Sequence, residues 1–126
     1  DDVDPFKMIQ RISTIESGEK QRAAASGIEF SPDGNHLFVT NAGINTVIIY
    51  DVDKETGVLT PLFHCKTSGD YPKAVAVMPD NKHFIVLSHE TDEIFIYNMN
   101  YEDCYFLQDS RPIEIEQPNC IFIHKL

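Results

Sequence analysis

Two neighbouring residues of a polar loop, His89 and Glu90 in SHETD, have side chains suited to acid–base chemistry. An imidazole accepts a proton near neutral pH, and an adjacent carboxylate can orient the ring. The alternative is a solvated surface loop with no chemical role. We predict His89 and Glu90 as candidate catalytic residues and keep the alternative open.

Two further residues are candidates for binding a substrate. Lys73, in GDYPKA, could hold an anionic group through its ammonium, or it could be a surface charge near Asp70. Asn41, at the start of NAGIN, could contact a ligand, although asparagine more often supports a turn through its side chain. These residues complete the candidate site that the surrounding elements must position.

No metal or cofactor is expected. Asp51, Asp53 and Glu55 alternate as at the start of a calcium loop. An EF-hand loop requires Gly at its sixth place and Glu at its twelfth, and this chain has Thr56 and Leu62 there. The segment DKETG is therefore predicted to be a hairpin turn.

The composition excludes several classes of function. The formal net charge of −10 disfavours a basic face for nucleic acid, although a local basic pocket could still bind an anionic small molecule. No apolar run is long enough to span a membrane. Cys65, Cys104 and Cys120 lack the paired spacing of a zinc site. We expect buried, reduced thiols in a cytoplasmic protein.

The chain contains one sequence pattern twice. SGIEFSPDGNHLFVTNAGINTVIIY at 26–50 aligns with KAVAVMPDNKHFIVLSHETDEIFIY at 73–97. A third copy begins with PNCIFI at 118–123, which resembles the PKAVAV that opens the second copy. A fixed period of roughly 20–50 residues is typical of repeat architectures. His36 and His83 match between the copies, which indicates a structural role for both.

Each copy predicts four short antiparallel strands separated by turns. SPDG and DKETG contain the Pro, Asp and Gly of turns, and the segments between them are rich in β-branched and aromatic residues. No segment has helical periodicity, so we predict an all-β fold. The predicted strands are 27–30, 36–40, 46–52, 58–66, 73–77, 83–87, 93–99 and 105–109.

Apolar runs such as VIIY and IFIY would place apolar side chains on both faces of each sheet. Such sheets stack as blades, so the predicted fold is a β-propeller fragment with about two complete four-stranded antiparallel blades. Gly27, Ala74 and Ala76 fall on the first strand of each copy, where space near the propeller axis is tightest. A β-sandwich of short hairpins is the alternative.

Residues 1–126 are interpreted as a single region with four parts. These are the last strand of a preceding blade at 6–15, blades at 26–67 and 72–110, and the first strand of a further blade at 117–126. Two blades alone leave broad apolar sheet faces uncovered. The expected partners are therefore the remaining propeller blades or another copy of the chain.

Alternating strand directions distribute the loops over two rims. The SPDG and DKETG turns share one rim, which we call the turn rim. The opposite rim, which we call the substrate rim, carries all four candidate site residues. Its loops are 19–25, 41–45, 68–73, 88–92 and 116–119.

Three stretches together resemble a known family. They are SPDGNHLFVTNAGINTVIIYDVDKETGVLT, SGDYPKAVAVMPDNKHFIVLSHETDEIFIY and QPNCIFI. The ordered set is similar to the closing blades of the lactonase-type seven-bladed β-propeller family. That family includes bacterial 6-phosphogluconolactonases and the fungal carboxymuconate lactonising enzyme.

The resemblance implies a substrate near the axis on the substrate rim, and hydrolysis of an anionic sugar lactone such as 6-phosphogluconolactone. Family members often carry Arg after the Asn of the second loop and His two residues further, where this chain has Ala42 and Ile44. They often carry Arg after the Pro of the next loop, where this chain has Lys73. A non-catalytic propeller that binds a small ligand or a protein on its rim is the second hypothesis.

Overall fold

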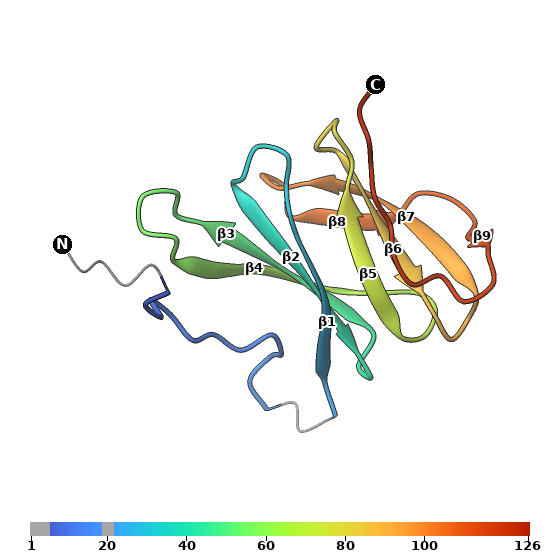
Figure 1. The fold of residues 1–126 in the computed structure, drawn as a ribbon, viewed down its shortest axis with the longest axis horizontal. Helices are drawn as coiled ribbons and strands as arrows, with labels where there is room; N and C mark the ends of the chain where they lie inside the picture. The colour runs from blue at the N-terminus through green and yellow to red at the C-terminus, as the bar shows by residue number, and fades with distance from the viewer. Residues whose placement is uncertain (1–5, 19–21) are drawn as a thin grey trace.

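The computed structural model describes residues 6–18 and 22–126, and residues 24–114 contain two antiparallel β-sheets (Figure 1). The first sheet has the order β1-β2-β3-β4 and the second β5-β6-β7-β8, with β9 also pairing with β7. The strands are β1 (Ala24–Phe30), β2 (His36–Ala42), β3 (Thr46–Val52), β4 (Leu59–Lys66), β5 (Pro72–Val77), β6 (His83–Ser88), β7 (Glu93–Asn100), β8 (Tyr105–Gln108) and β9 (Ile113–Glu114).

The prediction of an all-β propeller fragment is confirmed, and the described residues contain no α-helix. Consequently no described helix could cross a membrane. Of the predicted 19–25 loop, residues 19–21 lie outside the described residues.

The turns form where the sequence supplies turn chemistry. In SPDG, the Ser31 hydroxyl donates to Asp33 Oδ1 over 2.6 Å, and Gly34 adopts a φ of 72°. Asn81, 47 residues after Gly34, has a φ of 55° in the corresponding turn of the second sheet. Asparagine tolerates this left-handed region better than most residues, so both turns close in the same way.

The DKETG segment forms the predicted hairpin turn. Asp53 Oδ1 accepts hydrogen bonds from the backbone N–H groups of Glu55 at 2.9 Å and Thr56 at 3.1 Å. These two bonds lower the pKa of the Asp53 carboxyl, which is fully solvated. The side chain that resembled a calcium ligand is thus used to close the turn.

The main core lies between the two sheets, which pack face to face. Phe38 of β2 contacts Phe84 of β6 with ring centroids 5.3 Å apart, and Phe84 stacks on Tyr97 at 4.8 Å. Gly27 allows β1 to approach β5 closely, since a Cβ built there would lie 3.1 Å from the Cα of Ala74. The expected crowding between the first strands of the two blades is therefore observed.

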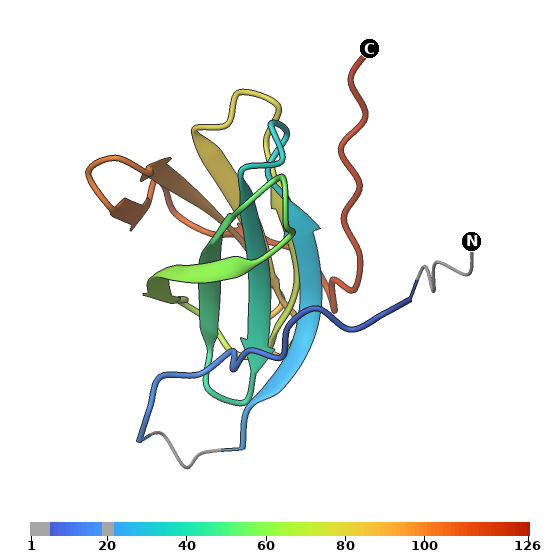
Figure 2. The ribbon, with the colours of Figure 1, turned by 90° about the vertical axis from the view of Figure 1, so that its left-hand side faces the viewer.

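Residues 10–14 lie against the first sheet, and the described residues 6–15 contain no strand (Figures 1 and 2). Ile12 packs on a second core cluster that includes Ile48. The Gln10 side chain accepts from the Leu59 N–H at 2.7 Å and donates to the Leu59 carbonyl at 2.9 Å. Isolated side-chain contacts, and no backbone ladder, join residues 10–14 to the first sheet.

The C-terminal segment 117–126 is extended and pairs with no described strand of this chain. Ile121, Phe122 and Ile123 instead line a hollow of about 230 Å³ with side chains of β1 and β5. At the start of this segment, the Gln117 N–H donates to Asp92 Oδ1 at 2.8 Å. The assignment of 6–15 and 117–126 to neighbouring blades stays a prediction.

The outer edge of the second sheet differs from the prediction of one strand at 105–109. β8 pairs with the end of β7, whereas β9 pairs with its start at Glu93 and Ile94. Pro112 lies between β8 and β9 and has no N–H to continue a ladder. The sequence analysis missed β9, which is only two residues long.

The three cysteines do not share one environment. Cys65 is buried in the main core, and desolvation raises the pKa of its thiol to about 11. Cys104 and Cys120 are exposed, which corrects the expectation of buried thiols. Cys104 lies in the turn before β8 with a φ of 47°, and Cys120 lies in the unpaired C-terminal segment.

Candidate functional site

Three loops meet on the substrate rim, and polar side chains tie them together. Asn45, in the loop between β2 and β3, donates to Asp70 Oδ1 at 2.9 Å. Its Oδ1 accepts from the backbone N–H of Tyr71 at 3.0 Å. Asp70 in turn receives the backbone N–H of Glu90 on its carbonyl at 3.3 Å. The rim is therefore one connected surface that spans both blades.

Close packing at Gly69 constrains the loop between β4 and β5. Gly69 has a φ of 80°, and a Cβ at this position would lie 2.5 Å from Phe95 and 2.7 Å from Thr91. Tyr71 also has a positive φ, of 61°. Only glycine fits both the conformation and the space at position 69, so a substitution there would disturb the loop that carries Tyr71.

His89 and Glu90 lie together on this rim. His89 Nδ1 is 2.9 Å from Glu90 Oε1, and the backbone N–H of His89 donates to the Tyr71 carbonyl at 3.0 Å. The Tyr71 and His89 rings meet edge to face with centroids 6.3 Å apart. The contact with Glu90 leaves His89 Nε2 without a partner among the described residues, as a base would require.

Lys73 occupies a β-bulge at the start of β5. Pro72 pairs with Ser88 and Ala74 pairs with Leu87, so Lys73 has no partner in the ladder. Its side chain is partly buried, and its ammonium forms no ion pair with any residue that the structure describes. Bulges are frequent next to functional sites. This one places a cation at the start of β5, beside the end of β6, and His89 directly follows β6.

The same bulge occurs in the first blade, at Ser26. Ala25 pairs with Asn41 and Gly27 with Thr40, which leaves Ser26 unpaired. The Ser26 hydroxyl donates to the Pro72 carbonyl at 2.6 Å, so this side chain bridges the two sheets. The two equivalent positions therefore have different roles: Ser26 joins the two blades, and Lys73 supplies a charge that forms no ion pair with any described residue.

Asn41 is fully buried, in contrast to the other predicted site residues. Its Nδ2 donates to the Thr14 carbonyl at 2.7 Å and to Thr46 Oγ1 at 3.2 Å. These bonds fasten the segment before β1 to the sheet face. The structure gives Asn41 this anchoring role, and its contact with a substrate stays a prediction.

An acidic hollow of about 420 Å³ lies beside the His89–Glu90 loop. Its lining includes the carboxylates of Asp92, Glu93, Glu114 and Glu116. In residues 6–18 and 22–126, no group of three His, Cys, Asp or Glu side chains is placed to hold a metal ion. Like charges repel an anion from this hollow, so an anionic group on the rim would be favoured at Lys73.

Sequence reasoning missed Asn45, Asp70 and Tyr71 as organisers of the rim. Asn45 had a usable signal, since asparagine in a Gly-containing loop is a candidate for positive φ, and it adopts 54°. Asp92, 47 residues later, has a φ of 57° and accepts the Gln117 N–H at 2.8 Å. This hydrogen bond corresponds to the one from the Tyr71 N–H to Asn45. Both bonds depend on loop packing, which sequence patterns do not reveal.

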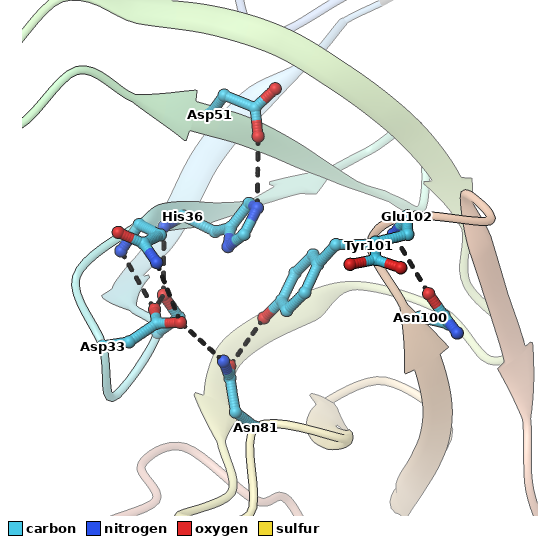
Figure 3. A network of polar contacts seen from close by, with 9 residues as sticks. Asp33, His36, Asp51, Asn81, Asn100, Tyr101 and Glu102 are labelled. Carbon is cyan, nitrogen blue, oxygen red and sulfur yellow. Dashed lines mark hydrogen bonds and ion pairs between the residues drawn. The ribbon is translucent and has the colours of Figure 1, made fainter.

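The turn rim carries a separate polar network that joins the two blades (Figure 3). Asn81 donates to Asp33 Oδ2 at 2.8 Å and accepts from the Tyr101 hydroxyl at 2.9 Å. The Tyr101 ring stacks on His36 with centroids 3.6 Å apart, and His36 Nε2 lies 3.1 Å from Asp51. The structural role predicted for His36 agrees with its position in this inter-blade contact.

The position of His36 predicts a pH dependence of stability. Burial lowers the pKa of His36 below its usual 6.5, although Asp51 and Asp33 oppose this shift. The unfolded chain therefore binds more protons, so this contribution is present above about pH 6.5 and is lost as the pH falls toward the folded pKa. Urea unfolding should show a stability loss between about pH 7.5 and 5.5 that is smaller in His36→Gln. An equal loss in both proteins would contradict this origin.

Comparison with known proteins extends the geometric findings. The family described as "Lactonase, 7-bladed beta-propeller" matches residues 2–123. The chain is 21% identical over 122 residues to 6-phosphogluconolactonase of Bacillus subtilis, covering 96% of the chain and 35% of that protein. It is 28% identical over 120 residues to a probable 6-phosphogluconolactonase of Arthroderma benhamiae, covering 90% of the chain and 30% of that protein.

A solved structure supports the same fold. Periplasmic gluconolactonase of Pseudomonas aeruginosa matches with a TM-score of 0.78 and 20% identity, over 84% of this chain and 30% of that one. The chain thus spans about a third of the length of these relatives.

Proposed function

Because this chain belongs to the seven-bladed β-propeller lactonase family, we propose that it is part of a hydrolase acting on an anionic sugar lactone such as 6-phosphogluconolactone. One observation carries the proposal. The His89–Glu90 pair and the unpaired Lys73 lie at the same end of the paired strands β5 and β6. The reaction needs a base to activate water, and an anionic substrate needs a cation to bind it.

In the proposed reaction, His89 Nε2 takes a proton from a water molecule as the water oxygen attacks the lactone carbonyl carbon. The ring C–O bond then breaks, and His89 returns the proton to the departing alkoxide oxygen. The products are a carboxylic acid and an alcohol within one open-chain molecule. Glu90 acts as a positioning residue, because its contact with Nδ1 keeps Nε2 directed at the water.

Charge on the rim supports an anionic substrate bound in one orientation. Lys73 would hold the phosphate or carboxylate of the substrate through a charge-assisted hydrogen bond. The acidic hollow lined by Glu93, Glu114 and Glu116 would repel the same group. The substrate would therefore lie with its anionic group at the start of β5 and its lactone ring toward His89.

The second candidate is a propeller that binds the same ligand without turnover. It is favoured by Ala42, which is buried, and by Ile44, since neither can supply a charged contact beside Asn41. Binding and turnover measured on one sample separate the two candidates. Binding of 6-phosphogluconate, the stable product, without hydrolysis of the lactone would establish the second.

Lys73→Met tests the anion contact in the intact protein. We expect KM for 6-phosphogluconolactone to rise about 10- to 100-fold with little change in kcat, because a charged hydrogen bond is lost from substrate and transition state alike. KM for the uncharged glucono-δ-lactone should not rise. Lys82→Met, which removes an exposed lysine of the turn rim, is the matched control. Equal KM values in the wild type and Lys73→Met would contradict the assignment.

A further inference from the structure

The contact between the blades contains an aromatic insertion. Tyr101, in the turn after β7, reaches across to the first blade and stacks on His36 with an interplanar angle of 1° (Figure 3). Its ring also meets Phe38 edge to face at 6.5 Å. This insertion leaves the His36 side chain only 12% exposed.

In the second blade, His83 has the position that corresponds to His36, but no aromatic ring of this chain stacks on it among the described residues. His83 pairs with Asn98 across β6 and β7, as His36 pairs with Asp51 across β2 and β3. His83 and Asn98 line a hollow of about 660 Å³. The His83 side chain is 35% exposed, and Asp80 Oδ2 holds its Nδ1 at 2.6 Å.

The face around this hollow is apolar and uncovered. Tyr105 is 46% exposed, Leu107 is 56% exposed and Ile113 is 52% exposed. Leu107 pairs with Asn98, so its side chain lies on the same face as the hollow. In the first blade the corresponding face is the one buried against the second blade, where Phe38, Val47 and Ile49 form the core.

We propose that the hollow at His83 receives an aromatic side chain from a further propeller blade, inserted as Tyr101 is inserted at His36. The aromatic residue occupies the place of Tyr101 in the partner blade, in the turn between its third and fourth strands. Its ring stacks on the His83 imidazole, and the partner sheet covers Leu107 and Ile113. This contact continues the existing blade–blade interface by one step and is independent of the proposed reaction.

A second copy of this chain fits the hollow poorly. The residue of the first blade that corresponds to Tyr101 is Lys54, whose Nζ already donates to the Asp33 carbonyl at 2.6 Å. Gln10, Ile12 and Thr14 already contact the sheet face that such a copy would have to present. A different blade with an aromatic residue in that turn is therefore the occupant.

A three-blade chain provides the test. In this designed protein, residues 1–118 are followed directly by a second copy of residues 73–126. The joint is at Pro118 because Pro118 corresponds to Pro72, the residue before the second blade's first copy of Lys73. The added blade then carries its own Tyr101, and the control carries Tyr101→Lys in the added copy only. Stacking should lower the carboethylation rate of His83 roughly three- to tenfold relative to the control, and should move its ring protons upfield.

Two results would overturn the proposal. One is an equal His83 rate in the tyrosine and lysine chains. The other is protection of His83 in the 126-residue chain that rises with concentration, which would make a second copy the occupant. If the three-blade chain aggregates, N-acetyl-tyrosinamide titrated into the 126-residue chain replaces it. The probe should then shift the ring protons of His83, and no shift would count against the proposal.

Discussion

Replacing His89 with alanine is expected to lower kcat for 6-phosphogluconolactone by about 10²- to 10⁴-fold, the usual contribution of a positioned general base. In the proposed reaction the imidazole is the group that removes the proton from water, and its loss also leaves Glu90 without the ring that it contacts at 2.9 Å. KM should change little, since Lys73 still binds the anionic group. The measurement is the initial rate of lactone opening in the intact protein, corrected for spontaneous hydrolysis.

Three controls give this result its meaning. His124→Ala removes an exposed histidine of the C-terminal segment and should leave kcat unchanged. Added imidazole should restore part of the rate in His89→Ala, whereas a structural defect would not respond. Glu90→Gln should retain binding and change the pH–rate profile, because it alters the partner of the proposed base. A full rate in His89→Ala, with an unchanged melting temperature, would exclude the proposed mechanism.

The second large effect concerns stability. Phe84→Ala should lower the free energy of unfolding by about 3–5 kcal/mol, the range for removing a buried aromatic side chain. Phe84 is fully buried between the sheets and contacts both Phe38 and Tyr97. The void would lie in the contact between the blades, where neither sheet can move inward without losing its contacts elsewhere.

Urea unfolding of Phe84→Ala should be compared with Phe122→Ala. Phe122 is 84% exposed, and its replacement should change the free energy of unfolding by no more than about 0.5 kcal/mol. A loss below about 1 kcal/mol in Phe84→Ala would mean that the sheets repack freely. The face-to-face core would then contribute little to the stability of the pair of blades.

Much of the sheet arrangement could be predicted because each local signal agrees with the others. The strand β3 has a β-branched run, and Gly34 and Gly57 adopt the positive φ that their turns require. The segments at the two ends could not be predicted in the same way. Residues such as Ile12 and Ile121 have strand-like neighbours in sequence, but a strand also needs an edge to pair with, and this is a property of the assembly.

The candidate site shows a similar division. The loop positions of His89 and Lys73 followed from strand direction alone, and the structure places both at one end of β5 and β6. The burial of Asn41 did not follow, because it depends on Thr14, which approaches from the segment before β1. A contact between residues 27 positions apart leaves no periodic signal in the sequence.

The two bulges have a consequence for how this scaffold can diversify. Ser26 and Lys73 occupy the same place in their blades, and the pairs on either side keep the same register. A bulged residue is left out of the ladder, so its replacement leaves strand pairing intact. After a blade is duplicated, selection can therefore change the charge of one blade near the axis while its sister keeps the ancestral side chain. Ligand preference can change in this way through single substitutions that keep the sheet folded.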